Sequence, residues 1–110
     1  MLNLLTRPRR LRRTSAIRAL VQESSLSSDD LMLPLFVTED EEKSEIESMP
    51  GVYREPISSL PQRCKELMDL GLKAVALFPK VPSEKKDSDG KESINPESLV
   101  IRSVRMLKSA

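Results

Sequence analysis

Histidine and tryptophan are absent from this chain of 110 residues, and Cys64 is its single cysteine. A lone cysteine cannot form an internal disulfide or a cysteine-based metal cluster, and this usage suits a reducing compartment. A cysteine nucleophile needs a basic partner such as histidine. Because Cys64 has no histidine to activate it and lies on an apolar helical stripe, we interpret it as a small buried hydrophobe.

Long apolar runs are also lacking, which excludes two kinds of segment. No run approaches the ~20 apolar residues of a membrane span. The N-terminus has no apolar core of about 7–15 residues, so it is not a secretory signal. An arginine-rich start without acids is part of the transit-peptide pattern. We therefore expect a cytoplasmic protein that does not associate with membranes, and a plastid location stays open.

Charge is unevenly distributed along the chain, although the net charge is only +1. Residues 21–60 carry ten acids against two basic residues. Residues 1–20 carry no acid and six arginines, which are Arg7, Arg9, Arg10, Arg12, Arg13 and Arg18. Opposite blocks favour protein–protein pairing at least as much as nucleic-acid binding. A nucleic-acid binder would also show interleaved aromatics or a helix-turn-helix pattern, and neither is present.

Two apolar runs of strand length alternate with two helical patterns. LMLPLFV (31–37) and KAVALFP (73–79) are unbroken runs, typical of strands buried on both faces of a parallel sheet. We expect Pro34 to interrupt the hydrogen-bond ladder of the first strand, since proline has no N–H to donate. Strand–helix–strand order predicts a βαβ unit and an α/β fold class.

The helices have recognisable start and stop signals. A short helix follows Thr14 or Ser15 as its cap, with an apolar face at Ala16, Ile17, Leu20 and Val21. A second helix covers residues 58–70, with Pro61 in its first turn and Gly71 after its end. Its apolar stripe comprises Leu60, Cys64, Leu67 and Met68.

A last helix is expected to begin with Asn95 as its N-cap and Pro96 in its first position. Its inward positions are Leu99, Val100, Val104 and Leu107.

Three connecting segments carry weaker signals. Residues 38–48 are acidic and are expected to be solvated, and Pro50-Gly51 predicts a tight turn. Asp87 and Asp89 flank Gly90 in a way that suggests a cation loop, but no glutamate closes the loop at the EF-hand position. We therefore interpret residues 80–96 as a solvated loop.

Four blocks together resemble the beginning of the porphobilinogen synthase family, also called delta-aminolevulinic acid dehydratase. They are RPRRLRRTSAIRALVQESSLSSDDLMLPLFV, SMPGVYR, LGLKAVALFP and INPESLVIRSVRMLK, in family order. The resemblance runs from about Arg7 to Lys108. It implies an N-terminal arm with a short helix over residues 1–30, and the first two strand–helix units of a (β/α)₈ barrel over residues 31–110. Because such barrels need ~250 residues, we expect the barrel to be incomplete and the chain to be the first part of a longer fold.

The resemblance also implies an activity. The family condenses two molecules of 5-aminolevulinate to porphobilinogen, on the path to haem and chlorophyll, through Schiff bases on two lysines, and its members use zinc or magnesium. No lysine here matches the family's lysine motifs, and no residue matches its metal ligands. We therefore predict no catalytic, cofactor-binding or metal-binding residue in this chain and expect the chain alone to be inactive. Only Lys73, at the edge of the second strand, merits inspection, since a Schiff-base lysine needs a desolvated pocket.

For the opening arginines the resemblance implies an arm that wraps a neighbouring subunit of a homo-oligomer, with subunit contacts through Arg7, Arg9, Arg10 and Arg12. A planar guanidinium suits such interfaces because it pairs with carboxylates through two hydrogen bonds. A merely solvated basic tail is the simplest alternative. Two other functions also stay open, namely a non-catalytic module that docks on full-length subunits and a small nucleic-acid binder.

Overall fold

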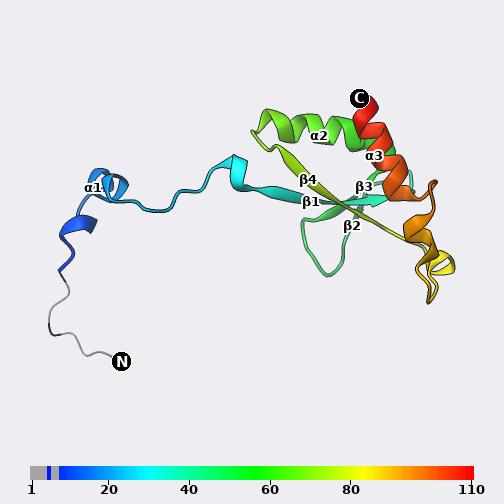
Figure 1. Cartoon of the computed structure of the whole chain (residues 1–110), viewed down its shortest axis with the longest axis horizontal. Coiled ribbons are helices and arrows are strands. Elements are labelled where there is room, and N and C mark those ends of the chain that lie inside the picture. The colour runs from blue at the N-terminus through cyan, green and yellow to red at the C-terminus, as the bar shows by residue number, and fades with distance from the viewer. Residues whose placement is uncertain (1–4, 6–7) are drawn as a thin grey trace.

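A single open sheet with helices on one face forms the body of the protein, as the computed structural model shows for Leu5 and residues 8–110 (Figure 1). The strands are β1 (Met32–Thr38), β2 (Ser44–Glu45), β3 (Tyr53–Pro56) and β4 (Ala74–Pro79), in the spatial order β2-β3-β1-β4. β1 runs parallel to both β3 and β4, whereas β2 and β3 are antiparallel. The predicted α/β class and the parallel pairing of the two apolar strands are confirmed.

The β2–β3 hairpin was not predicted, because residues 38–48 are acidic and show no strand alternation. Its turn is the expected Pro-Gly turn. Gly51 has a φ of 80°, and the N–H of Val52 donates to the carbonyl of Met49 at 3.0 Å. Glycine adopts this left-handed backbone conformation without a steric cost. The turn therefore determines where the chain reverses.

The core lies between the sheet and two helices, α2 (Leu60–Asp69) and α3 (Leu99–Ser109) (Figure 1). Its buried side chains come from β1, α2 and α3 and comprise Leu35, Val37, Leu60, Leu67 and Leu99. Leu33, Val75 and Leu77 pack against them from the same face of the sheet. Burying each such side chain contributes about 1.5–3 kcal/mol.

The expectation that the apolar strands are buried on both faces is wrong. Along β1 the side chains alternate, with Met32 and Pro34 exposed and Leu35 and Val37 buried. Helices cover only one face of the sheet, so the opposite face of β1 and β4 lies open (Figure 1). The expected interruption of the strand ladder at Pro34 is also wrong on the side of β4. The pairing of β1 with β4 continues through Pro34, from Met32 to Val37. β3 pairs with β1 only from Phe36 onward, and a strand with one neighbour at that position tolerates proline.

Two positions that were predicted to face inward on the helices are exposed, because the helices pack against only one sheet layer. Met68 on α2 is 69% exposed and Val104 on α3 is 39% exposed. Ser103 is instead completely buried on α3, where its hydroxyl donates to the carbonyl of Leu99 at 2.7 Å. A single layer of sheet covers a narrower stripe of each helix than the apolar pattern predicts.

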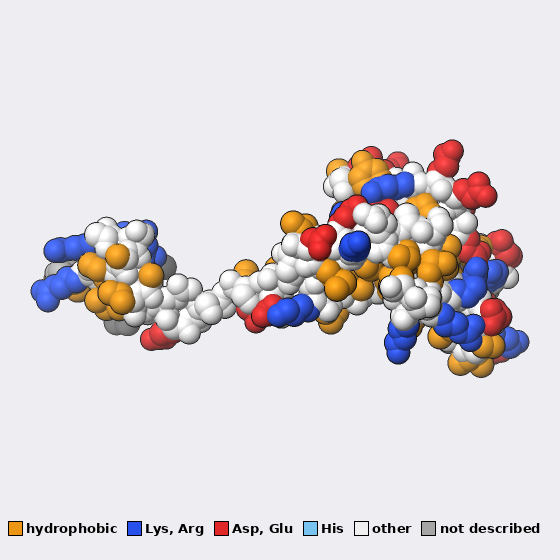
Figure 2. Space-filling view, turned by 90° about the horizontal axis from the view of Figure 1, so that it is seen from above, with side chains coloured by type: hydrophobic (Ala, Val, Ile, Leu, Met, Phe, Trp, Pro, Cys, Tyr) orange, Lys and Arg blue, Asp and Glu red, His pale blue; other side chains and the backbone are white. Residues whose placement is uncertain are grey.

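The N-terminal segment stands apart from the sheet (Figures 1 and 2). It contains a short 3-10 turn, η1 (Arg10–Arg12), and the helix α1 (Ser15–Leu20). The predicted cap is confirmed, since Thr14 Oγ1 accepts a hydrogen bond from the N–H of Ile17 at 3.2 Å. No core of described residues covers the apolar side chains of α1, and Leu20 is 85% exposed. Within the described residues, no helix is both long and apolar enough to cross a membrane.

Candidate functional site

The carboxyl ends of β1 and β4 lie side by side, with Val37 opposite Pro79. The N–H of Lys80 continues this pairing and donates to the carbonyl of Val37 at 2.8 Å. In open parallel sheets, ligands bind at the carboxyl ends of the strands. The residues that follow the two strands therefore form the candidate site.

Asp40 joins the two strand ends. Thr38 Oγ1 donates to Asp40 Oδ2 at 2.9 Å, and the ammonium group of Lys80 contacts the same oxygen at 2.7 Å. These contacts, with that of Lys80 the stronger, hold the pKa of the Asp40 carboxyl below its usual range. Both contacts favour the charged form of the carboxyl.

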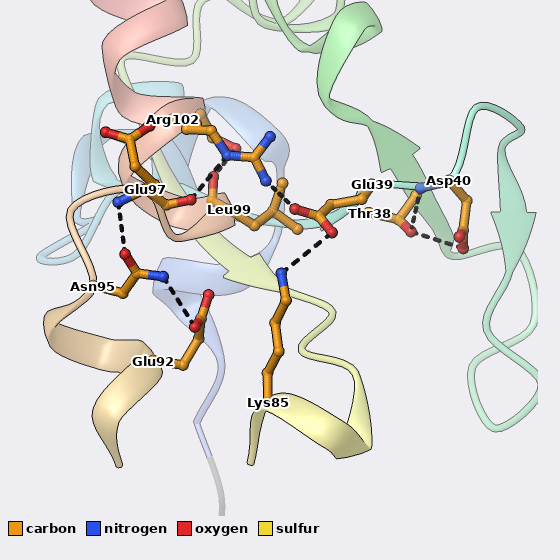
Figure 3. Close-up of polar contacts among 10 residues, drawn as sticks. Thr38, Glu39, Asp40, Lys85, Glu92, Asn95, Glu97, Leu99 and Arg102 are labelled. Carbon is orange, nitrogen blue, oxygen red and sulfur yellow. Dashed lines mark hydrogen bonds and ion pairs between the residues drawn. The ribbon is translucent and has the colours of Figure 1, made fainter.

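Glu39 reaches across to α3 (Figure 3). Its carboxylate pairs with the guanidinium of Arg102 and lies 3.7 Å from the ammonium of Lys85. Arg102 also donates from Nε to the carbonyl of Glu97 at 3.0 Å. These contacts connect the end of β1, the loop after β4 and the first turns of α3.

The predicted N-cap of the last helix is wrong by three residues. α3 begins at Leu99, and its N-cap is Ser98. Asn95 instead accepts a hydrogen bond from the N–H of Glu97 at 3.0 Å and donates to Glu92 at 3.2 Å (Figure 3). Asn95 therefore organises the turn before the helix, because its short side chain competes for nearby backbone groups.

A pocket of about 230 Å³ opens at this junction. Its apolar wall comes from the segment that leaves β4 and from the start of α3. Its polar groups belong to Glu39, Lys80, Lys85, Glu92, Ser93 and Ser98. The lining carries two cationic and two anionic side chains, and among the described residues it offers no nucleophile–base pair.

Sequence reasoning missed this cluster, although one signal for it was available. Thr38, Glu39 and Asp40 directly follow the first apolar run, and Lys80 directly follows the second. Parallel pairing brings those two positions together. No local signal connects Glu39 with Arg102, which lies 63 residues further along the chain.

Of the predicted subunit-contact arginines, Arg9, Arg10 and Arg12 belong to the N-terminal segment, which stands apart from this junction (Figure 1). Arg7 lies outside the described residues. Arg9, Arg10 and Arg12 are exposed, and none of them forms an ion pair with a described residue. Arg9, Arg12, Arg13 and Arg18 line one open hollow in this segment.

Lys73, Cys64 and Asp87 have structural roles. Lys73 is 71% exposed and pairs with Asp29 at 2.6 Å, so it lacks the desolvation that a Schiff-base lysine needs. Cys64 is half-buried against the core, and this burial raises the pKa of its thiol. Asp87 Oδ1 accepts hydrogen bonds from the N–H groups of Asp89 and Lys91, both at 3.1 Å, and thereby shapes its own loop.

Over Leu5 and residues 8–110, no three cysteine or carboxylate side chains gather closely enough to hold a metal ion. The described residues therefore do not fit the zinc or magnesium that the family resemblance implies, and we assign no metal ligand among them.

Comparisons with a family model, with individual relatives and with solved structures all match the same family. A family model for delta-aminolevulinic acid dehydratase matches residues 5–110. The chain is 43% identical, over 110 residues, to the delta-aminolevulinic acid dehydratase of Chlamydia pneumoniae, covering 99% of this chain and 33% of that protein. It is 45% identical over 103 residues to the chloroplastic delta-aminolevulinic acid dehydratase of Physcomitrium patens, covering 93% of this chain and 24% of that protein.

A solved structure of delta-aminolevulinic acid dehydratase from Toxoplasma gondii ME49, in complex with its product porphobilinogen, superimposes on this chain with a TM-score of 0.87. It is 40% identical, and the match covers 99% of this chain and 31% of that one. The chain thus spans about a quarter to a third of the length of the relatives that it matches.

Proposed function

Because this chain belongs to the delta-aminolevulinic acid dehydratase family, we propose that it provides the N-terminal arm and the first two strand–helix units of a porphobilinogen synthase. In this proposal residues 1–30 are the arm, and residues 31–110 are the opening part of a (β/α)₈ barrel. The observation that carries the proposal is the superposition of nearly the whole chain on one part of a family structure.

The reaction assigned to the complete enzyme is the condensation of two 5-aminolevulinate molecules to porphobilinogen. The described part of this chain contributes scaffold to that reaction. Its sheet exposes one apolar face along β1 and β4, as the inner face of an unfinished barrel would. We assign no catalytic or metal-binding residue to it. A cytoplasmic or plastid location belongs to the same proposal, since the matched relatives include bacterial and chloroplastic proteins.

The arm is proposed to contact a second subunit through Arg7, Arg9, Arg10 and Arg12. The exposed guanidinium groups of the last three and the uncovered apolar side chains of α1 support this role. An arm of this kind becomes stable when another surface covers it. Carboxylates on that surface would pair with the arginines through two hydrogen bonds each.

The test of the family activity starts from the native polypeptide, captured from its source with an antibody against residues 80–96. We expect the captured material to form porphobilinogen from 5-aminolevulinate, measured by mass spectrometry, and its intact mass identifies the chain that carries the activity. Captured material that forms no porphobilinogen at any mass would contradict the proposal.

The subunit contact is tested in the same native assembly by reversing two charges, Arg9→Glu together with Arg10→Glu. We expect the assembly to shift to smaller species in analytical ultracentrifugation. The matched control is Lys65→Glu together with Lys86→Glu, because both lysines are exposed and neither forms an ion pair with a described residue. An assembly that withstands the arginine reversal, or that is broken equally by the control, would exclude this role.

A further inference from the structure

An open hollow of about 360 Å³ in the N-terminal segment is lined, among the described residues, by arginines alone. These residues, which we call the arginine hollow, are Arg9, Arg12, Arg13 and Arg18. All four are exposed, and none of them forms an ion pair with a described residue. Like charges gathered in one hollow repel one another unless anions lie between them. The arginine hollow is therefore suited to a group of negative charges.

The same segment carries apolar side chains that the described residues leave uncovered. Leu11 is 59% exposed and Leu20 is 85% exposed. Figure 2 shows basic and apolar side chains next to one another on the face of this segment that is in view. α1 has only six residues, and an isolated helix of that length is marginal in water. A surface that stabilises this segment therefore has to offer both carboxylates and apolar contact.

Carboxylates without a paired cation gather in the connection from β1 to β2 of the same chain. Glu41, Glu42 and Glu47 are exposed, and none of them forms an ion pair with a described residue. The two acids that precede them, Glu39 and Asp40, already pair with basic residues of the body. We call residues 41–47 the acidic connection.

The one basic residue inside the acidic connection, Lys43, is engaged elsewhere. Its ammonium group binds Glu55 at 2.7 Å and lies 4.9 Å from the centroid of the Tyr53 ring. β2 is the outermost described strand on its side of the sheet, in the order β2-β3-β1-β4. The acidic connection therefore lies at an edge of the sheet that a second molecule can approach.

The arginine hollow is held away from the sheet (Figure 1). Residues 22–27, between α1 and the 3-10 turn η2 (Ser28–Asp30), contain neither helix nor strand. Six extended residues span up to about 20 Å, so the segment projects far enough to reach another molecule. Every copy of the chain carries both the basic and the acidic group. A two-fold dimer therefore forms the same contact twice, once from each copy.

We propose that the arginine hollow of one chain docks on the acidic connection of a second copy, which docks in return. The arginines pair with the carboxylates of Glu41, Glu42 and Glu47, and the contact covers the apolar side chains of α1. This inference rests on the proposed subunit contact and identifies the surface that receives it. A nucleic acid fits the hollow less well, because no described residue of its lining is aromatic and could stack on a base.

The experiment reverses the charges of each side separately in the full chain. Arg9→Glu together with Arg12→Glu changes the hollow, and Glu41→Arg together with Glu42→Arg changes the acidic connection. In sedimentation velocity each variant should associate with itself about tenfold or more weakly than the parent, because like charges then face one another. An equimolar mixture of the two variants should regain the association, since every hollow then meets a connection of opposite charge.

The matched control is Asp69→Arg together with Glu84→Arg. Both acids are exposed, and neither forms an ion pair with a described residue. This variant introduces the same charges outside the acidic connection and should associate like the parent. Added salt should weaken the association of the parent, because exposed ion pairs are screened.

A disulfide locates the contact independently of its strength. A ¹⁵N-labelled chain with Arg10→Cys is mixed with an unlabelled chain with Glu42→Cys, both with Cys64→Ala, and oxidised with glutathione disulfide. Mass spectrometry should find the two introduced cysteines joined between a labelled and an unlabelled chain. Glu84→Cys, used in place of Glu42→Cys, should give little of the joined product.

Three results would overturn the inference. Weaker association in the arginine variant alone would mean that the arm docks on another surface, which leaves the proposed subunit contact standing. A mixture that does not regain association and forms no disulfide would mean that the two groups do not meet. Retention of the parent on duplex DNA that the arginine reversal abolishes, with association of the chains unchanged, would assign the hollow to a nucleic acid.

Discussion

At the scale of single residues, Asp40 shows how a contact between two strand ends lowers the pKa of a carboxyl group. The carboxylate binds the Lys80 ammonium and the Thr38 hydroxyl, and both contacts favour its charged form. The pKa of Asp40 is therefore lowered in the folded chain. A lowered pKa stabilises the fold at pH values above the carboxyl's unfolded pKa, and this contribution is lost as the pH falls through the folded pKa.

Replacing Lys80 tests this directly. In Lys80→Met we expect the pKa of Asp40 to rise toward the ordinary aspartate value of about 3.9, because the main cause of its depression is removed. Carboxyl carbon NMR of the full chain as a function of pH measures the pKa. Lys65→Met is the control, since Lys65 lies on α2 and forms no ion pair with a described residue. An Asp40 pKa that is equal in the Lys80 variant and the parent would mean that the ion pair does not form in solution.

At the scale of elements, the end of α2 is determined by one glycine. Gly71 has a φ of 93°, and its N–H donates to the carbonyl of Met68 at 2.9 Å. The N–H of Leu72 donates to the carbonyl of Leu67 at 3.0 Å. These two bonds form a Schellman motif, and Leu72 packs against the core cluster that includes Leu67. The motif thus directs the chain from α2 into β4.

We expect Gly71→Ala to lower the free energy of unfolding by about 1–2 kcal/mol, the cost of a Cβ in the left-handed region. The loss should exceed that of Gly51→Ala. Gly51 has a similar φ of 80° with no atom within 4 Å of an added Cβ, whereas an added Cβ at Gly71 lies 2.9 Å from Ser28 Oγ. Urea denaturation of the three chains measures the difference. Equal losses in the two variants would mean that Ser28 moves aside without cost.

At the scale of the whole molecule, the chain is extended and partly uncovered. Its radius of gyration is 21.6 Å, against about 13 Å for a compact chain of 100 residues. The N-terminal segment accounts for the length (Figures 1 and 2). The open face of the sheet pairs Met32 with Ala74, Pro34 with Ala76 and Phe36 with Phe78 across β1 and β4. Exposed apolar faces of this kind mark surfaces that another element or chain covers.

We therefore expect the 110-residue chain to associate with itself as its concentration rises, because this face and the free edge of β4 are both available. Met32→Lys together with Phe78→Lys should weaken association at least several-fold in sedimentation velocity, since both side chains are half or more exposed on that face. Met68→Lys together with Leu70→Lys places the same charges on α2 and on the residue that caps its C-terminus, away from the sheet face, and should have little effect. A chain that stays monomeric at high concentration would contradict the expectation.

The family could be predicted from the sequence, and the match to the family model confirms this prediction. So were the features that depend on a few neighbouring residues: the apolar runs of β1 and β4, the Thr14 cap, the Pro50-Gly51 turn and the glycine that ends α2. Backbone preferences, caps and turn residues act within about one helical turn or one reverse turn, so a local pattern records them.

Tertiary structure alone decided which face of β1 is covered and that Ser103 is buried. It also brought Glu39 to Arg102 and Lys80 to Asp40. Each of these depends on segments 40 or more residues apart packing against one another, or on how far a single sheet layer covers a helix. The contacts that join the separate elements of the candidate site are long-range, because the ends of parallel strands become neighbours only when the sheet forms.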